Sequence, residues 1–199
     1  RKSVEDVFKD LLDAGLNSMP GGGAEVFSER VRKALFKQKI GADRWLEIHR
    51  IAHRMGIRTN ATLLFGHIET YEERVTHMLK LRDLEDEAPG FLAFIPLEFQ
   101  KGYTDLVERQ ASALEDLRTI AMSRLVWDNV PHVKSYWVML GEETASLGLN
   151  FGASDIDGTI GEEKIAHAAL AASPLGLARE RLVDLIREAG KTPVEVLEK

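Results

Sequence analysis

The pattern of apolar and polar positions alternates along the chain between two periods. Apolar residues three and four apart predict helices, whereas short apolar runs bounded by glycine or polar turns predict strands. The predicted strands lie within residues 16–26, 57–65, 91–99, 133–140 and 154–160. The predicted helices cover residues 3–14, 43–55, 113–125, 142–149, 161–171 and 175–189, and one more begins at the capping box of Thr70 and Glu73.

The predicted strands alternate with helices and are apolar on both faces, which is typical of a parallel sheet covered by helices. Successive strands begin roughly 20–45 residues apart, a range that brackets the ~31 residues per unit of a (β/α)8 TIM-type barrel. The 199 residues hold about five such units. Two α/β folds fit this count: an open five-stranded sheet, or a partial barrel that lacks its first three units.

Composition narrows the class of protein. The sequence is 44% apolar and no linker divides it, so we expect residues 1–199 to form a single domain. Its net charge of −6 and its scattered lysines argue against nucleic-acid binding. No apolar run has the ~18 residues of a membrane span, and no signal peptide is visible. We therefore expect a cytoplasmic protein without a nucleic-acid or membrane partner.

The sequence contains no cysteine. This excludes disulfides, thiolate nucleophiles and a cysteine-held iron–sulfur cluster within these residues. His49 and His53 are spaced to share a metal on one helix, but histidines on a helix that covers a sheet are more often structural. We predict no metal site in this chain.

Polar side chains interrupt the second predicted strand. Asn60 and Thr62 share one face, whereas Ala61, Leu63 and Phe65 share the other. A barrel that holds a ligand in its lumen has this arrangement. A strand whose polar side chains bond the neighbouring backbone has it too, and the spacing by itself favours this second interpretation.

Charged residues follow the carboxyl ends of predicted strands, where α/β barrels carry their active sites. His67 and Glu69 follow the second strand, and Asp157 lies on the last one. A histidine there can move protons or bind a carboxylate, and a glutamate can orient a cationic ligand. A capped turn with solvated side chains fits the same positions equally well. For Lys134, on the fourth strand, we expect a salt bridge at the barrel rim.

Four segments carry a resemblance to a known family. They are GLNSMPGGGAEVFSERVR from Gly15, TNATLLFGHIETYEERVTHM from Thr59, GFLAFIPLEF from Gly90 and LNFGASDIDGTIGEEKIAHAA from Leu149. Together they resemble the aminofutalosine (aminodeoxyfutalosine) synthases, radical S-adenosylmethionine (SAM) enzymes of the futalosine route to menaquinone. The sister family, the cyclic dehypoxanthine futalosine synthases, shares the GGGAE and ET-x-x-ER stretches. The Asp157-Gly158-Thr159 segment and His167 favour the first family.

The resemblance implies a (β/α)8 barrel of the radical SAM kind, with a [4Fe–4S] cluster held by three cysteines after the first strand. This chain has no cysteine, so it resembles the C-terminal part of such an enzyme, with strands four to eight. We expect the chain alone to be inactive. In the whole enzyme, a transferase, the implied reaction adds the 5′-deoxyadenosyl radical from SAM to 3-[(1-carboxyvinyl)oxy]benzoate. The product is 6-amino-6-deoxyfutalosine.

The resemblance also suggests roles for side chains around the lumen. Glu25 suits the ribose hydroxyls of SAM, and Arg32 suits its methionine carboxylate, because a guanidinium binds a carboxylate with two parallel hydrogen bonds. The full set of candidates is Glu25, Arg32, Asn60 and Thr62 for the cofactor, and His67, Glu69 and Asp157 for the substrate.

Two alternatives stay open at this point. One is the sister cyclase, and the other is a non-catalytic binding module that uses a partial barrel. In either case the missing units would leave unpaired sheet edges, so we expect homo-oligomers that form through these edges.

Overall fold

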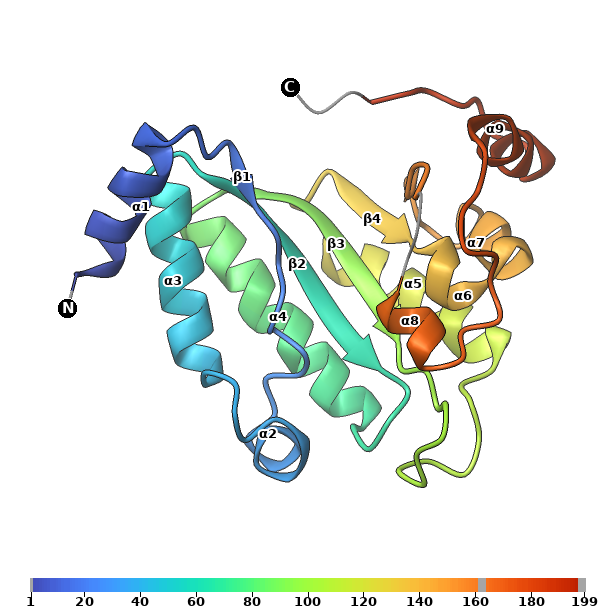
Figure 1. The fold of residues 1–199 in the computed structure, drawn as a ribbon, viewed down its shortest axis with the longest axis horizontal. Helices are drawn as coiled ribbons and strands as arrows, with labels where there is room; N and C mark the ends of the chain where they lie inside the picture. Colours follow the sequence, from blue (N-terminus) through green and yellow to red (C-terminus); the bar gives the residue numbers. More distant parts are fainter. Residues whose placement is uncertain (1, 161–163, 197–199) are drawn as a thin grey trace.

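A single parallel sheet organises the computed structural model, which describes residues 2–160 and 164–196. Its strands stand in chain order and each neighbouring pair is parallel. A doubly wound sheet would reverse its order at a switch point, whereas a barrel winds in one direction, so the partial TIM-type barrel is confirmed (Figure 1). The strands are β1 (Ser18–Met19), β2 (Arg58–Phe65), β3 (Phe91–Glu98), β4 (His132–Ser135) and β5 (Asp155–Ile156).

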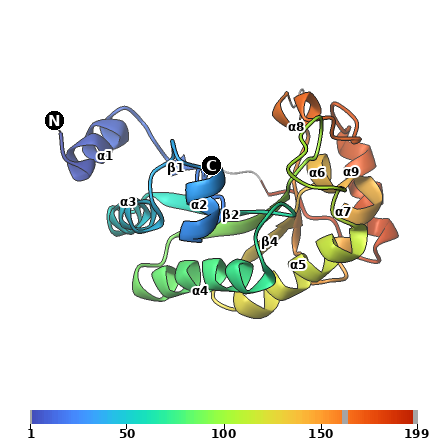
Figure 2. The same cartoon turned by 90° about the horizontal axis from the view of Figure 1, so that it is seen from below.

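Helices cover the outer side of this sheet. Figure 2 shows α3, α4 and α5 along one side, and in Figure 1 α2 and α8 lie toward the end of the molecule to which the arrows of β2 and β3 point. Within residues 2–160 and 164–196, no helix combines the length and apolar character that crossing a membrane requires. The helices are α1 (Val4–Asp13), α2 (Glu29–Leu35), α3 (Ala42–Arg54), α4 (Tyr71–Glu87), α5 (Ala113–Val126), α6 (Trp137–Leu140), α7 (Glu142–Gly148), α8 (Ile165–Ala168) and α9 (Arg179–Glu188).

The two faces of β2 differ as its sequence predicts. Ala61, Leu63 and Phe65 are buried against the helices, whereas Asn60 and Thr62 are half-buried on the opposite, open face. Register extends this open face across the sheet, because paired residues of parallel strands point to the same side. It continues through Ala93, Ile95 and Leu97 of β3, which stand beside Asn60, Thr62 and Leu64.

Several expectations from the sequence need correction. The fourth strand ends at Ser135, and Trp137 and Val138 form a fully buried helical turn instead of extending it. A buried apolar run has no periodicity that separates strand from helix. The fifth strand has only two residues, Asp155 and Ile156. Helix α2 was not predicted, although Ser28 caps it by accepting a hydrogen bond from the backbone N–H of Val31.

The predicted helix 161–171 is observed in part. Helix α8 spans Ile165–Ala168, and residues 161–163 lie outside the described residues.

The first strand is also shorter than predicted, and the chain then runs along β2 without ladder pairing. Leu64 donates its backbone N–H to the carbonyl of Glu25 at 3.0 Å. A Cβ added at Gly21 would lie 2.2 Å from the backbone oxygen of Asn60, whereas one added at Gly22 would meet nothing within 4 Å. The first glycine is therefore required by a close approach of two backbones.

We predict that Gly21→Ala destabilises the chain by about 1–3 kcal/mol, because the added methyl group forces β1 away from β2. The matched control is Gly22→Ala, whose side chain enters open space. Urea unfolding of both variants measures the difference. Equal unfolding midpoints would show that this approach of the backbone is not needed.

We also predict that the chain associates with itself. In the part of the chain described, β1 pairs only with β2, and β5 pairs only with β4, so each leaves one edge for another chain. Light scattering should show a mass that rises with concentration, and a lysine at the exposed edge position (Ser18→Lys) should reduce it. A mass that stays monomeric for the native sequence at high concentration would contradict this prediction.

Candidate functional site

The turn between β2 and α4 is built around one buried carboxylate. The side chain of Glu69 has no exposed surface. Its oxygens accept hydrogen bonds from the backbone N–H groups of Gly66 (2.6 Å) and His67 (2.9 Å) and from Arg74 Nε (2.8 Å). Burial alone would raise the pKa of Glu69, but the hydrogen bond from His67 and the charges of His67 and Arg74 lower it to about 2. Glu69 therefore stays ionised, and its hydrogen bonds fix the conformation of the turn between β2 and α4.

The side chain of His67 has no exposed surface in the same turn. Its Nδ1 lies 2.9 Å from a carboxylate oxygen of Glu69, and its Nε2 lies 3.1 Å from the carbonyl oxygen of Leu64. The rings of Phe36 and Phe99 stand nearly perpendicular to the imidazole, with centroids 6.0 and 5.9 Å from it. The histidine thus joins the strand end to two aromatic side chains from other segments.

Arg74 extends this network from α4 to α5. Its guanidinium donates to Glu115 at 2.6 Å and to the hydroxyl of Thr119 at 3.0 Å. It also lies over the rings of Phe65 and Tyr71, at 5.1 and 4.6 Å from their centroids. A buried guanidinium with carboxylate partners on two elements fixes the distance between α4 and α5.

A second group of carboxyls lies at the end of β3. Glu98 is the last residue of the strand, is 4% exposed, and accepts a hydrogen bond from the side chain of Gln100 at 3.0 Å. Asp116 of α5 is 3% exposed, and its Oδ1 has no hydrogen-bond partner. Burial, together with the charges of Glu98 and Glu115, raises the pKa of Asp116 to about 8. Asp116 is therefore mostly protonated at neutral pH.

This pair was not predicted from the sequence. Glu98 was visible only as a charge that ends an apolar run, and that signal does not reveal a partner on a later helix.

Of the four cofactor candidates, Asn60 and Thr62 lie on the open face of β2, whereas Glu25 precedes α2 and Arg32 lies within it. The hydroxyl of Thr62 donates to the carbonyl of Gly21 at 3.0 Å, as the structural interpretation of that residue predicts. The side chain of Asn60 makes no hydrogen bond to the described part of the chain. Glu25 has a positive φ of 50° and forms an ion pair with Lys39.

Arg32 is the candidate with the most fixed environment. It is 5% exposed, and its guanidinium donates to the carbonyls of Ala24, Val26 and Ile40. These contacts hold the loop after β1 against the end of α2. Carboxylate binding by Arg32 stays a prediction, and it would require some of these bonds to break.

Asp157 directly follows β5, the last strand of the sheet. Lys134 Nζ is 3.0 Å from Asp157 and 3.4 Å from Asp155, so the rim salt bridge expected for Lys134 is confirmed. Burial would lower the pKa of Lys134, but the two carboxylates outweigh it and raise the pKa. On α8, His167 Nε2 lies 2.9 Å from the carbonyl of Ser173.

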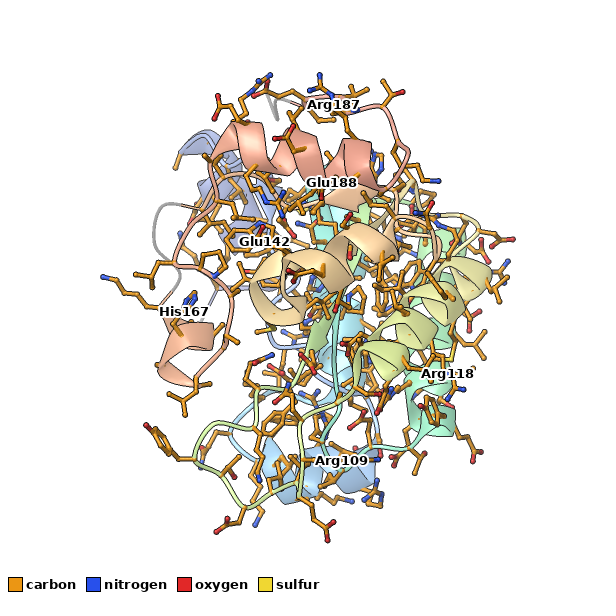
Figure 3. All side chains as sticks on the ribbon, turned by 90° about the vertical axis from the view of Figure 1, so that its right-hand side faces the viewer. Arg109, Arg118, Glu142, His167, Arg187 and Glu188 are labelled. Atoms are coloured by element: carbon orange, nitrogen blue, oxygen red, sulfur yellow. The ribbon has the colours of Figure 1, made fainter. Side chains whose placement is uncertain are left out.

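Helix α9 is tied to this side of the molecule. Arg181 contacts Glu142 at 2.7 Å and Glu188 at 3.2 Å, and Figure 3 shows these two glutamates on α7 and α9.

Two clefts open where the strands end. One, of about 440 Å³, lies between the end of α2, residues 99–106 and Ala169. The other, of about 530 Å³, lies between residues 66–74, residues 106–111 and Glu115. The segment from 99 to 112 forms a wall of both, with Arg109 labelled on it in Figure 3. The candidate site therefore occupies the carboxyl edge of the sheet, where barrels of this kind place their ligands.

A singly wound parallel sheet with its clefts at the carboxyl edge defines an α/β protein of the TIM-barrel class. Comparison with known families makes the assignment specific. The family model described as the CofH/MqnC C-terminal region matches residues 88–196, and the chain belongs to this family.

Curated relatives align with nearly the whole chain. An aminodeoxyfutalosine synthase of Thermus thermophilus is 49% identical over 200 residues, which cover 98% of this chain and 54% of that protein. A 5-amino-6-(D-ribitylamino)uracil–L-tyrosine 4-hydroxyphenyl transferase of Methanopyrus kandleri is 40% identical over 98% of this chain and 54% of its own. A cyclic dehypoxanthine futalosine synthase of Streptomyces coelicolor is 40% identical over 97% and 48%. The chain spans about half the length of these relatives.

The raised pKa of Asp116 predicts that the free energy of unfolding depends on pH. The folded chain retains a proton that the unfolded chain loses above its ordinary pKa of 3.8, so stability falls as pH rises from about 4 to about 8. The slope is at most about 1.4 kcal/mol per pH unit. Asp116→Asn cannot ionise, and we expect it to be more stable than the native chain at pH 7–8, with the difference vanishing near pH 4.

Urea unfolding between pH 4 and 9 measures this effect. Asp105→Asn, at an exposed position on the neighbouring loop, is the matched control and should follow the native chain. If Asp116→Asn ran parallel to the native curve at every pH, Asp116 would not be held protonated.

Proposed function

We propose that this chain is the C-terminal part of a radical SAM enzyme of the futalosine route to menaquinone. The proposed enzyme adds a 5′-deoxyadenosyl radical to 3-[(1-carboxyvinyl)oxy]benzoate and forms 6-amino-6-deoxyfutalosine. The observation that carries the proposal is the identity of 49% to an aminodeoxyfutalosine synthase, against 40% to the cyclase and to the hydroxyphenyl transferase. The open face and rim clefts of the partial barrel support a small-molecule substrate.

The iron–sulfur cluster does not fit the residues of this chain. The sequence has no cysteine. Among residues 2–160 and 164–196, no group of three histidine, aspartate or glutamate side chains is arranged to hold a metal ion. The cluster ligands of the proposed enzyme would lie in the part of its relatives that this chain does not cover, and no step is assigned to the cluster here.

The open face fits part of SAM, the second group that the proposal requires. Asn60 offers an amide that no described side chain or backbone group occupies, so it can donate to and accept from a nucleoside. The backbone of Gly22 and Gly23 leaves open space on its side-chain face. When bound, SAM would supply the adenosyl group, while Thr62 and Arg32 hold the wall of this face through their backbone partners.

In this proposal, the substrate-side candidates orient the substrate and take no part in proton transfer. Glu69 is enclosed by its four donors and orients His67, which in turn packs on Phe36 and Phe99. Asp157 neutralises Lys134 and so sets the charge at the far end of the open face. Each would place the substrate and exclude water rather than exchange a proton with it.

The sister cyclase is the alternative, and product analysis separates the two. The part of the Thermus thermophilus enzyme that this chain does not cover should be joined ahead of this chain and reconstituted anaerobically. We expect 6-amino-6-deoxyfutalosine from 3-[(1-carboxyvinyl)oxy]benzoate, measured by mass spectrometry. Formation of cyclic dehypoxanthine futalosine from its precursor would favour the cyclase. A folded hybrid without either product would favour a non-catalytic module.

In the same hybrid we predict that Asn60→Leu lowers turnover by at least about tenfold, the equivalent of one lost hydrogen bond to the cofactor. Stability should change little, because leucine on a half-buried face has room. The matched control is Arg58→Leu, an exposed position at the start of the same strand. A large fall in melting temperature with normal activity per folded enzyme would assign Asn60 a structural role instead.

A further inference from the structure

The smaller of the two rim clefts draws its lining from three separate connections. Leu35 and Phe36 follow β1, residues 99–106 follow β3, and Ala169 follows β5. Loops that follow alternate strands of a barrel meet over the mouth of its lumen. The cleft therefore lies where a substrate enters the open face of the sheet, and its volume of about 440 Å³ is in the range of small-molecule sites.

Three of the described residues that line this cleft are aromatic. Phe36, Phe99 and Tyr103 contribute rings, Leu35 and Leu106 contribute aliphatic surface, and Gln100 and Thr104 contribute polar groups. Lys101 is the one charged residue among the described residues of the lining. The ring of Tyr103 is 88% exposed, an unusual position for a large aromatic side chain. The lysine's Nζ lies 2.7 Å from the carbonyl oxygen of Glu108, which holds the ammonium on the loop. An apolar cleft with one cation at its wall suits a flat apolar ligand that carries a negative group.

The aromatic wall is fixed before any ligand arrives. Phe36 and Phe99 meet the imidazole of His67 at interplanar angles of 77° and 82°. His67 itself is held by Glu69 and the carbonyl of Leu64. Rings that are already oriented can make edge-to-face or offset contacts with an aromatic ligand without the entropic cost of ordering them. An aliphatic ligand of equal size gains only the burial of surface.

We propose that this cleft binds the aryl carboxylate portion of the substrate, with Phe36, Phe99 and Tyr103 against the ring and Lys101 beside the carboxylate. The assignment rests on the proposed function for the identity of that aryl group. It makes His67 a positioning residue, which acts on the substrate through the two phenylalanines.

Binding to the 199-residue chain tests the proposal without catalysis. The probe is 3-hydroxybenzoate, titrated by calorimetry, and 3-hydroxycyclohexanecarboxylate is the non-aromatic comparison. We expect saturable binding of the aryl acid at one site, and binding about tenfold weaker for the saturated ring, since aromatic contacts supply the difference. Absence of saturable binding, or equal affinity for both acids, would overturn the proposal.

Variants locate the site. Phe36→Leu and Phe99→Leu should each weaken binding of 3-hydroxybenzoate about three- to tenfold. Tyr103→Leu should do the same, and at its exposed position it leaves folding intact. Phe151→Leu, on the loop that leads into the amino end of β5, is the control and should bind like the native chain. Unchanged affinity in Tyr103→Leu together with unchanged affinity in the folded phenylalanine variants would place the aryl group elsewhere.

The outcome is separable from that of the proposed function. If the hybrid enzyme forms 6-amino-6-deoxyfutalosine with the same KM in all three variants, the proposed function is supported and the proposed binding of the aryl group in this cleft is contradicted. If the chain binds 3-hydroxybenzoate through these rings but its hybrid forms no such product, the cleft is supported as an aryl site and the proposed function is contradicted.

Discussion

Glu69 carries a negative charge in a position from which water is excluded, and the architecture of the rim follows from the groups that stabilise it. Two backbone N–H groups, an imidazole and a guanidinium surround the carboxylate, so the cost of its desolvation is offset in place. Arg74 links this carboxylate to α5 through its ion pair with Glu115. His67 links it to the rings of Phe36 and Phe99. Removing Arg74 would leave the buried carboxylate of Glu69 without its cation, which costs more than the lost contact.

The same edge of the sheet contains a carboxyl in the opposite state. Glu69 and Asp116 are both buried, yet the pKa of the first is lowered to about 2 and that of the second is raised to about 8. The difference lies in their neighbours. Glu69 receives hydrogen bonds and faces the guanidinium of Arg74, whereas Asp116 faces Glu98 and Glu115 and its Oδ1 has no partner. The rim thus combines a permanent charge that fixes one turn with a protonated acid that adds no charge between α5 and β3.

Relatives with three different names align with this chain over almost its whole length. The sheet, the turn at Glu69 and the outer helices belong to the scaffold that positions a site, and a scaffold does not by itself select a substrate. Selection falls to side chains that face the open side and the clefts, such as Asn60 and the rings of Phe36 and Phe99. These are few, and they come from connections far apart in the chain.

The sequence by itself determined the alternation of strands and helices, the two faces of β2 and the capping box of α4, because each follows from periodicity or from a contact within one turn. It also limited the fold to two choices and indicated the region of the site. Only the tertiary structure decided that the sheet is singly wound, that β4 ends at Ser135, and that Arg32 is held by three carbonyls. It alone placed Glu98 close enough to Asp116 to raise its pKa, and placed Phe36 and Phe99 against the same imidazole, that of His67. These pairs are separated by many residues, and no local pattern records a contact that forms only when distant segments pack together.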